Sequence, residues 1–242
     1  MKIGIIKEFK NPPDKRVVFT PKKCIEAKER FPELDFLIQR SEIRSFSDEE
    51  YKDLGLSVVD DVSSADVLVG VKEVPIDKLI PNKPYFFFSH TIKKQVYNKK
   101  LLQAILQKNI QLHDHETIVD NKDVRLIGFG YYAGVIGTYN GLRALGLKEK
   151  LFKLPKACNL KDREEFDSEL KKILLPNIKI VLTGKGRVGS GAKEVLDYLN
   201  IKQVDVDEYL NNSFDYPVYV NIDVLDYNSR KDNFNPTIDN FY

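Results

Sequence analysis

Short apolar runs alternate with longer amphipathic stretches along the first half of the chain, and this alternation restricts the possible folds most strongly. The apolar runs lie at 3–6, 34–39, 66–71 and 85–90, and the stretches with helical periodicity lie at 21–31, 47–54 and 92–107. Strands that alternate with helices predict an α/β fold built on a mainly parallel sheet. The strands are apolar almost throughout, which is typical of a sheet covered by helices on both faces.

A second series of strand and helix begins near Ile178, after a charged helix candidate at 161–174 and the helix breaker Pro176. Between the two series, "FGYYAGVIGTYNGLRALGL" at 129–147 predicts a helix whose small residues allow close packing against another element. The expected organisation is an N-terminal α/β domain at 1–128, connecting helices at 129–177 and a further α/β domain at 178–242.

Composition limits the partners of the chain. The 36 acidic residues nearly balance the 38 basic residues, so no field of a single sign can attract nucleic acid or a membrane surface, and a small, roughly neutral partner is expected instead. Cys24 and Cys158 lie far apart and form no CxxC pair, so neither a disulfide framework nor a zinc site is expected. The opening "MKIGIIKEF" lacks the apolar core of a signal peptide, and the protein is expected to be cytoplasmic.

A glycine cluster follows the apolar run 178–182. Gly184, Gly186 and Gly189 have G-x-G-x-x-G spacing and precede a helix candidate at 187–199. In a dinucleotide site the first glycine makes the tight turn, the second lets backbone approach a pyrophosphate, and the third lets helix pack on strand. A glycine triplet alone can equally be a structural turn, but the strand before it and the helix after it favour a dinucleotide site.

The carboxylate that binds the ribose in such a site lies about 20 residues further on. Asp205 fits this spacing best, after the short apolar run "IKQV", and Asp207 is the rival. A carboxylate here would favour NAD over NADP, because it would repel a 2′-phosphate. The alternative is that either Asp residue caps the helix candidate that follows.

Charged side chains directly adjoin apolar strands in the first half. Arg16 precedes one such run, Lys72 and Glu73 end "ADVLVGVKEVP", and His90 ends "YFFFSH". Ligands gather at the carboxyl ends of parallel strands, although a single Lys or His there is more often structural. A lysine and a histidine that face one cleft could exchange protons near neutral pH.

"LHDHE" at 112–116 would place His113 and His115 on one face of a strand. A metal would need further ligands, and none is visible in the sequence, so no metal site is expected.

The sequence resembles the lysine-forming saccharopine dehydrogenases, relatives of the alanine dehydrogenases and of the N-terminal part of transhydrogenase. The resemblance rests on five segments in family order, which reach from Lys2 to Leu196: "KIGIIKEFKNPPDKRVVFTP", "GVKEVP", "FFFSHTIKKQ", "HDHETIVDNKDVRLIGFGYYAGVIG" and "GKGRVGSGAKEVL". It implies two Rossmann-like lobes with parallel sheets, and a second, dinucleotide-binding lobe that is incomplete here. It also implies a chain that is truncated at its C-terminus, since relatives continue for well over a hundred residues.

The resemblance further implies roles for individual residues. Lys72 and His90 match the catalytic acid and base groups, Arg16 and Glu73 match contacts to the substrate carboxylate and ammonium, and Glu116 matches a residue that tunes this cluster. Phe129 matches a substrate-side position, Gln95 and Arg125 match cofactor-side positions, and Gly186, Arg187 and Val188 match the segment over the pyrophosphate.

The implied activity is NAD-dependent oxidation of a saccharopine-like secondary amine to lysine and 2-oxoglutarate, or the reverse condensation. An alanine-dehydrogenase-like enzyme and an inactive binding protein remain as alternatives. The implied partners are a small amino-acid or 2-oxo-acid substrate and, as a possibility, further copies of the chain, with no nucleic acid and no membrane.

Overall fold

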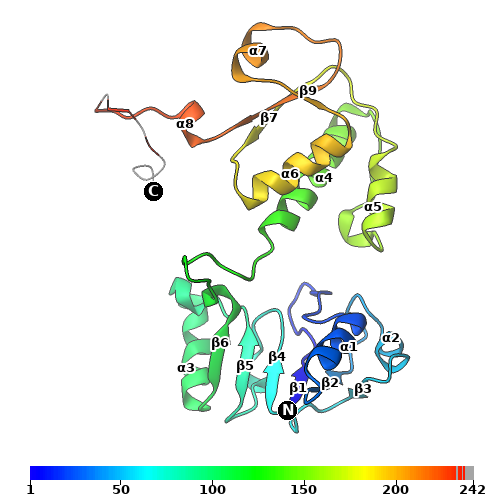
Figure 1. Ribbon diagram of the computed structural model, residues 1–242, viewed down its shortest axis with the longest axis vertical. Coiled ribbons are helices and arrows are strands. Elements are labelled where there is room, and N and C mark those ends of the chain that lie inside the picture. The colour runs from blue at the N-terminus through cyan, green and yellow to red at the C-terminus, as the bar shows by residue number, and fades with distance from the viewer. Residues whose placement is uncertain (233, 236, 238–242) are drawn as a thin grey trace. The chain divides into compact units, whose positions relative to one another are not determined.

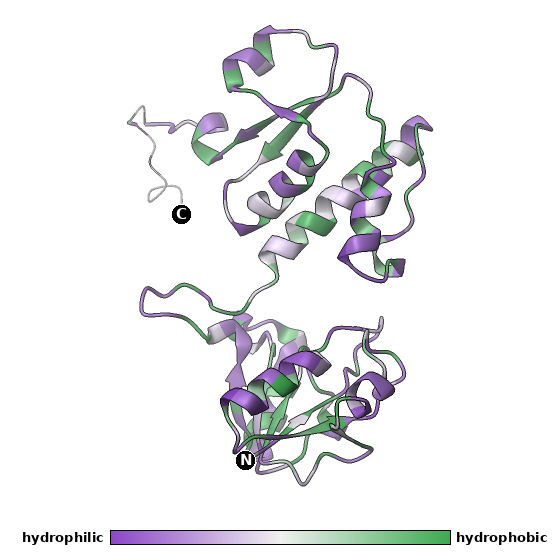
Figure 2. Ribbon diagram, turned by 45° about the vertical axis from the view of Figure 1, so that its right-hand side comes forward, coloured by the Kyte–Doolittle hydropathy of each residue, from purple (hydrophilic) through white to green (hydrophobic). Residues whose placement is uncertain are grey.

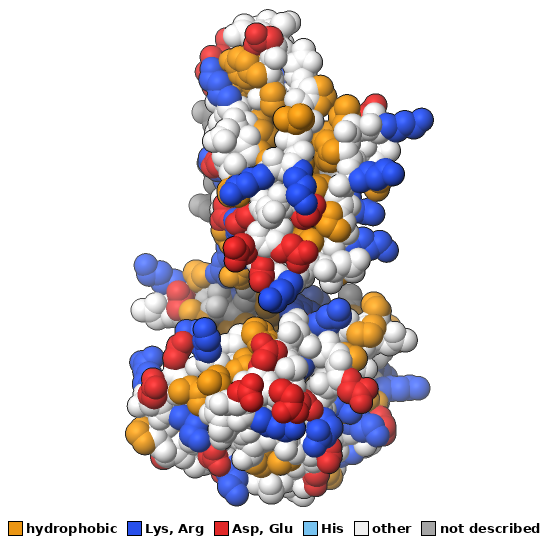
Figure 3. Space-filling model, turned by 90° about the vertical axis from the view of Figure 1, so that its right-hand side faces the viewer, with side chains coloured by type: hydrophobic (Ala, Val, Ile, Leu, Met, Phe, Trp, Pro, Cys, Tyr) orange, Lys and Arg blue, Asp and Glu red, His pale blue; other side chains and the backbone are white. Residues whose placement is uncertain are grey.

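The computed structural model describes residues 1–232, 234, 235 and 237, and these form two compact units. The first unit comprises Met1–Gly128, and the second begins at Phe129 (Figure 1). Positive and negative side chains are interspersed on the face shown in Figure 3, as the balanced composition predicts. Among the described residues, no helix has the length and apolar character needed to cross a lipid bilayer.

The first unit is a six-stranded parallel sheet with the order β3-β2-β1-β4-β5-β6. Its strands are β1 (Lys2–Ile5), β2 (Asp35–Gln39), β3 (Ser57–Val59), β4 (Val67–Val69), β5 (Pro84–Phe87) and β6 (Gln111–Asp114). Its helices are α1 (Pro21–Arg30), α2 (Asp48–Lys52) and α3 (Lys99–Gln107), with 3-10 turns η1 (Ile76–Lys78), η2 (Thr91–Lys93), η3 (Val96–Asn98) and η4 (His115–Thr117). The expected α/β class and parallel sheet are confirmed, and β3 and β6 are strands that the apolar runs did not identify.

Neighbouring residues of one strand enter cores on opposite faces of this sheet. Phe86 packs into the cluster that contains Cys24 of α1 and Tyr51 of α2, whereas Tyr85 and Phe87 pack into the cluster that contains residues of α3. A fully buried aromatic side chain of this size stabilises the fold by about 1.5–3 kcal/mol. The two cores explain why the strands are apolar at nearly every position, and Figure 2 shows the hydrophobic strands between more hydrophilic helices.

The helix expected at 92–107 begins only at Lys99. His90 and Lys94 have left-handed backbone conformations, with φ values of 56° and 52°, and the chain between them forms a 3-10 turn. A left-handed residue interrupts the ladder of α-helical hydrogen bonds, so the periodic pattern overestimated the length of this helix.

The second unit holds a three-stranded parallel sheet with the order β7-β9-β8. Its strands are β7 (Lys179–Thr183), β8 (Lys202–Gln203) and β9 (Val218–Ile222). Its helices are α4 (Gly130–Glu149), α5 (Arg163–Leu170), α6 (Arg187–Tyr198), α7 (Val206–Asn211) and α8 (Val224–Tyr227), with the 3-10 turn η5 (Ala157–Asn159).

The glycines of α4 and α6 let the two helices pack backbone to backbone. A Cβ added at Gly134 would lie 1.9 Å from the carbonyl oxygen of Val188, and one added at Gly191 would lie 1.9 Å from that of Tyr131. Both distances are far below any van der Waals contact, so neither position accepts a larger residue without displacement of a helix. The close packing expected of the small residues in 129–147 is confirmed.

Candidate functional site

The topology of the first sheet creates a switch point between β1 and β4. From β1 the chain builds the sheet outward through β2 and β3, then crosses back to β4 on the other side of β1. In open parallel sheets, ligands bind outside the carboxyl ends of the strands at such a point. Glu8 follows β1, Lys72 and Glu73 follow β4, and His90 follows β5, so these side chains extend from the same edge of the sheet.

Glu73 and His90 are hydrogen-bonded to each other. The distance from Glu73 Oε1 to His90 Nδ1 is 2.5 Å, and Lys10 Nζ lies 3.2 Å from Glu73 Oε2. Burial by itself would raise the pKa of Glu73, but hydrogen bonds from its own backbone, from His90 and from Lys10 outweigh it and hold that pKa below its usual value. Glu73 is therefore an ionised acceptor that orients the imidazole.

Lys72 lies in a partly buried, positively charged environment. Its Nζ atom is 5.6 Å from the centre of the Phe88 ring, and that ring stacks at 6.3 Å on the imidazole of His90. Burial lowers the pKa of Lys72, and the nearby charges of Arg16 and Lys10 lower it further. An amine with a lowered pKa accepts and releases a proton more easily near neutral pH than an ordinary lysine does.

Arg16 is paired with Asp14. The guanidinium donates to Asp14 through Nε, at 2.9 Å from Oδ1, and through a second short bond from Nη2 to Oδ2. The hydrogen bond from Arg16 is the largest cause of the lowered pKa of Asp14, and the same bond raises the pKa of Arg16. The pairing leaves the guanidinium partly exposed and permanently charged, as the capture of a carboxylate requires.

The side chain of Glu116 is nearly buried and forms ion pairs with two cations. Its Oε1 atom lies 3.1 Å from Nη2 of Arg125 and 3.3 Å from Nζ of Lys93, while Oε2 is buried without a hydrogen-bond partner among the described residues. The structure thus joins Glu116 to Arg125, two residues predicted from the sequence. Gln95 is exposed, and its backbone carbonyl accepts a hydrogen bond from Asn98 N at 3.0 Å.

Two residues of this region were not identified from the sequence, Glu8 and Phe88, and His115 was considered there only as a metal ligand. His115 is buried, its Nε2 atom lies 3.0 Å from the carbonyl oxygen of Gly70, and burial lowers its pKa. Glu8 lies three residues after the end of β1, just as Lys72 lies three residues after the end of β4. A charged residue at a strand end could therefore have identified Glu8, whereas Phe88 has no such signal because it continues an apolar run.

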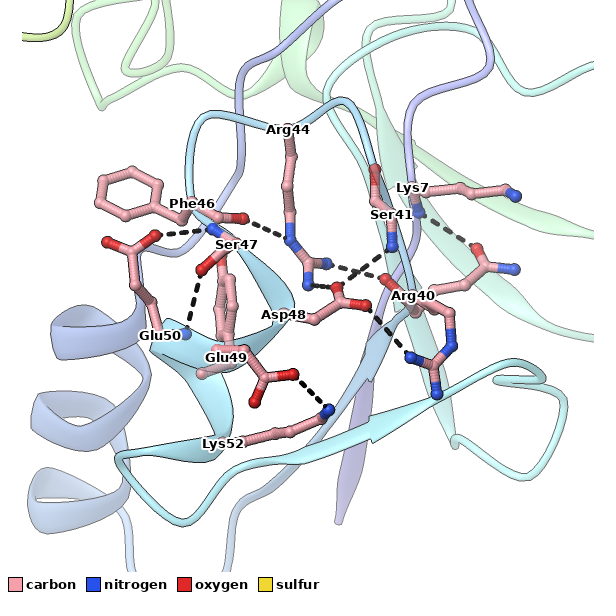
Figure 4. Close-up of polar contacts among 12 residues, drawn as sticks. Lys7, Arg40, Ser41, Arg44, Phe46, Ser47, Asp48, Glu49, Glu50 and Lys52 are labelled. Carbon is pink, nitrogen blue, oxygen red and sulfur yellow. Dashed lines mark hydrogen bonds and ion pairs between the residues drawn. The ribbon is translucent and has the colours of Figure 1, made fainter.

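Glu8 also lines an open cavity of about 520 Å³ at the carboxyl ends of β1, β2 and β3. Arg40 and Ser41 line the same cavity, and both contact Asp48, at 3.5 Å from Nη1 of Arg40 and 3.2 Å from the amide of Ser41 (Figure 4). Arg44 forms a short bond to Asp48 as well. The loop after β2 is thus fixed by one carboxylate at the N-terminus of α2, where the helix dipole favours negative charge.

The glycine loop of the second unit has the local form that its spacing predicts. Gly184 has a φ of 91°, in the left-handed region, and Gly186 is the N-cap of α6. A Cβ at Gly189 would lie 2.1 Å from the carbonyl oxygen of Gly184, whereas a Cβ at Gly186 would meet no atom within 4 Å. The third glycine therefore permits helix–strand packing, and the second faces open space at a helix N-terminus, which fits a phosphate group.

Arg187, Val188 and Phe129 all belong to the second unit. Arg187 and Val188 form the exposed first turn of α6. Phe129 precedes α4 and is 39% exposed. Asn221 of β9 donates from Nδ2 to the carbonyl oxygens of Leu182 and Gly184, at 3.1 Å each, and so holds the glycine loop, a role that the sequence analysis did not identify.

Asp205 is the N-cap of α7. Its Oδ1 atom accepts the amide of Glu208 at 2.7 Å, and the side chain of Glu208 returns a contact to the amide of Asp205, which completes a capping box. Asp207 accepts from Asn211 within the same helix. Since β9 lies between β7 and β8, Asp205 follows a strand that is not adjacent to the glycine loop. Its assignment to the ribose stays a prediction, and the capping role is the one that the structure records.

A doubly wound parallel sheet with ionisable side chains at its switch point defines a Rossmann-like α/β protein. The chain matches the family described as "Alanine dehydrogenase/PNT, N-terminal domain" over residues 4–136, which is more than half of its length, and it belongs to this family. The resemblance that the sequence motifs indicated is therefore confirmed.

Relatives and solved structures agree with this placement. The chain is 35% identical over 190 residues to the alpha-aminoadipic semialdehyde synthase of Bos taurus, which covers 71% of this chain and 20% of that protein. It is 24% identical over 237 residues to the lysine-forming saccharopine dehydrogenase of Yarrowia lipolytica, covering 81% of this chain and 64% of that protein. An L-alanine dehydrogenase structure covers 92% of this chain and is itself covered to 61%, with a TM-score of 0.63 and 20% identity, which shows the shared fold.

Proposed function

We propose that this chain provides the substrate-binding unit, and part of the cofactor-binding unit, of an NAD-dependent dehydrogenase that acts on an amino acid. The single observation that carries the proposal is the pairing of Glu73 with His90 at the switch point of the first sheet, beside a lysine, Lys72, whose pKa is lowered. The chain spans only 20% of the length of the bovine synthase that it matches, so the activity of such a whole protein is part of the proposal.

His90 is assigned the proton exchange with the reacting nitrogen or with the attacking water. Its Nδ1 atom is engaged by Glu73, so the imidazole can exchange a proton through Nε2 while the ring stays oriented. The ionised Glu73 also stabilises the imidazolium that forms when Nε2 takes up a proton.

Lys72 is assigned the second proton position. Its lowered pKa increases the fraction of neutral amine at a given pH, and the face of Phe88 shields Nζ from water on one side. Two groups that exchange protons from adjacent strand ends suit a reaction in which a nitrogen loses a proton and a water molecule is then activated.

Arg16 is assigned the substrate carboxylate. Glu116, which forms ion pairs with Arg125 and Lys93, is assigned the substrate ammonium. Arg16 presents a guanidinium that is held by Asp14, and a carboxylate can bind its exposed side. Both ion pairs of Glu116 are formed through its Oε1 atom.

The glycine loop is assigned the pyrophosphate of NAD. Gly184 and Gly186 supply the turn and the open approach, and the amides of Arg187 and Val188 lie at the positive end of α6. When bound, NAD supplies the acceptor for the hydride that leaves the substrate carbon.

A saccharopine-like secondary amine is the proposed substrate, because the relatives that the chain matches include alpha-aminoadipic semialdehyde synthases and saccharopine dehydrogenases. A smaller 2-amino acid is the second candidate, since the alanine dehydrogenase structure has the same fold and any such substrate presents a carboxylate beside the reacting carbon.

The first test is calorimetric titration of the chain with NADH, using the Gly186→Val variant for comparison. A Cβ at Gly186 meets no atom within 4 Å, so the variant should fold and lose binding through obstruction of the phosphate site. The matched control is Gly137→Ala on α4, where a Cβ also meets nothing and binding should persist. A folded wild-type chain that does not bind NADH would contradict the assignment of the glycine loop.

The second test is turnover with NAD, first with saccharopine and then with single amino acids. Lys72→Met and His90→Ala should each lower kcat by about 10²- to 10⁴-fold, the usual contribution of a positioned acid or base. NADH binding without turnover of any amino acid would favour a binding protein over an enzyme.

A further inference from the structure

The backbone that carries Lys72 is held by a buried carboxylate from the neighbouring strand end. Glu8 is 8% exposed; its Oε1 atom accepts the amide of Val71 at 2.7 Å, and its Oε2 atom accepts the amide of Lys72 at 2.9 Å. Each carboxylate oxygen therefore satisfies one amide, an arrangement that a group with a single acceptor oxygen cannot reproduce.

The backbone hydrogen bonds of the sheet hold the segment after β4 only as far as Val71. Gly70 donates to Phe86 O at 2.8 Å, and the carbonyl of Val71 accepts from Phe88 N at 3.0 Å. The amide of Lys72 bonds to Glu8 instead of to a strand. Glu8 thus extends the restraint of the sheet by one residue, to the position from which the lysine side chain projects.

The buried position of Glu8 is electrostatically unfavourable for its charged carboxylate. Burial raises the pKa of Glu8 and outweighs the two amide bonds, and Asp14 adds repulsion that Arg16 partly offsets. A Gln side chain would remove this unfavourable charge, but its NH2 group would then face one of the two amides, donor against donor.

We infer that Glu8 is a positioning residue for Lys72: its carboxylate fixes the backbone after β4 and thereby keeps the lysine Nζ against the ring of Phe88. The inference deepens the proposed function and rests on it, because it concerns the group assigned to proton exchange. Glu8 makes no contact with substrate in this assignment and acts only through the two amides.

The test uses the reactivity of Lys72, which requires neither NAD nor turnover. Trace acetylation with acetic anhydride, followed across pH by mass spectrometry, gives the protonation midpoint of each lysine. Burial lowers the pKa of Lys72 most, Arg16 and Lys10 lower it further, and Glu73 and Asp14 oppose them, so the midpoint reports how buried Nζ is and where it lies among these charges. In Glu8→Gln the released backbone should let Nζ move into water, and Lys72 labelling near neutral pH should fall about threefold, the equivalent of half a pH unit.

Tyr51→Phe is the matched control, because it removes another buried hydrogen bond of the same unit, from the Tyr51 hydroxyl to Phe19 O at 2.8 Å. Both variants should lose stability, but only Glu8→Gln should change Lys72. An unchanged Lys72 midpoint in folded Glu8→Gln, or an equal change in Tyr51→Phe, would overturn the inference.

Two further measurements keep the inference testable if the Glu8→Gln variant does not fold. Glu8→Asp keeps both oxygens on a shorter side chain and should shift Lys72 in the same direction. In the wild-type protein, amide hydrogen exchange at Lys72 should be slow, and fast exchange there would also overturn the inference. If wild type lacks turnover while Lys72 labelling responds to Glu8, the proposed function fails and the positioning role stands.

Discussion

Glu73 Oε1 lies 2.5 Å from Nδ1 of His90, so residues from two adjacent strand ends act as one unit. Lys10 contacts the other oxygen of the same carboxylate at 3.2 Å. With both oxygens engaged, Glu73 has a defined orientation, and that orientation sets the direction in which the imidazole faces. This hydrogen bond joins a residue after β4 to one after β5, so the two side chains have a fixed orientation relative to each other at this edge of the sheet.

The Glu73 pairing should make stability depend on pH. The pKa of Glu73 is lowered from its ordinary value of 4.5, and a carboxylate lowered in this way stabilises the fold above its unfolded pKa and loses that contribution as the pH falls through the folded value. The loss in unfolding free energy caused by Glu73→Gln should therefore be greatest near neutral pH and diminish below 4.5. Urea denaturation of both proteins from neutral to acidic pH measures this, and a difference that grows on acidification would contradict it.

The two cysteines should differ sharply in reactivity. Cys24 is fully buried, and burial raises the pKa of its thiol to about 12, whereas Cys158 is exposed. Because the thiolate is the reactive form, a thiol reagent should modify Cys158 in the native protein and Cys24 only after denaturation. Peptide mapping of the modified protein identifies the site, and rapid native labelling of Cys24 would show that α1 opens readily.

Glycines on one helix should tolerate alanine very differently. At Gly134 a Cβ would collide with the carbonyl oxygen of Val188, so Gly134→Ala should destabilise the second unit by about 1–3 kcal/mol or more. At Gly137 on the same helix a Cβ meets open space, and Gly137→Ala should be neutral or stabilise by about 0.5–1 kcal/mol. Denaturation curves of the two variants provide the comparison, and equal effects would rule out the backbone contact.

Asn221 should matter for the glycine loop. Asn221→Ala removes two hydrogen bonds, to the carbonyls of Leu182 and Gly184, and should weaken NADH binding about tenfold through a less ordered loop. Asn211→Ala, which removes a surface contact to Asp207 on α7, is the control and should leave binding unchanged. Calorimetric titration distinguishes the two, and similar affinities in both variants would mean that β7–β9 pairing alone holds the loop.

The sequence was informative where chemistry follows directly from a strand end. Lys72, Glu73 and His90 could be predicted as a group because a parallel sheet brings the carboxyl ends of its strands to one edge. Glu8 obeys the same rule but was missed, since its partners are the amides of Val71 and Lys72, 63 and 64 residues away. Backbone amides carry no signature in a sequence, so a side chain whose function is to bind them is not visible there.

The sequence by itself determined the α/β class, the parallel strands and the turn chemistry of Gly184 and Gly189, because apolar periodicity and left-handed backbone are local properties. Only the tertiary structure decided that β9 lies between β7 and β8, and that Glu8 accepts the amides of Val71 and Lys72. These outcomes depend on which strand pairs with which and on which buried donors need acceptors. Such choices are made by contacts between residues distant in the chain, and a local pattern does not record them.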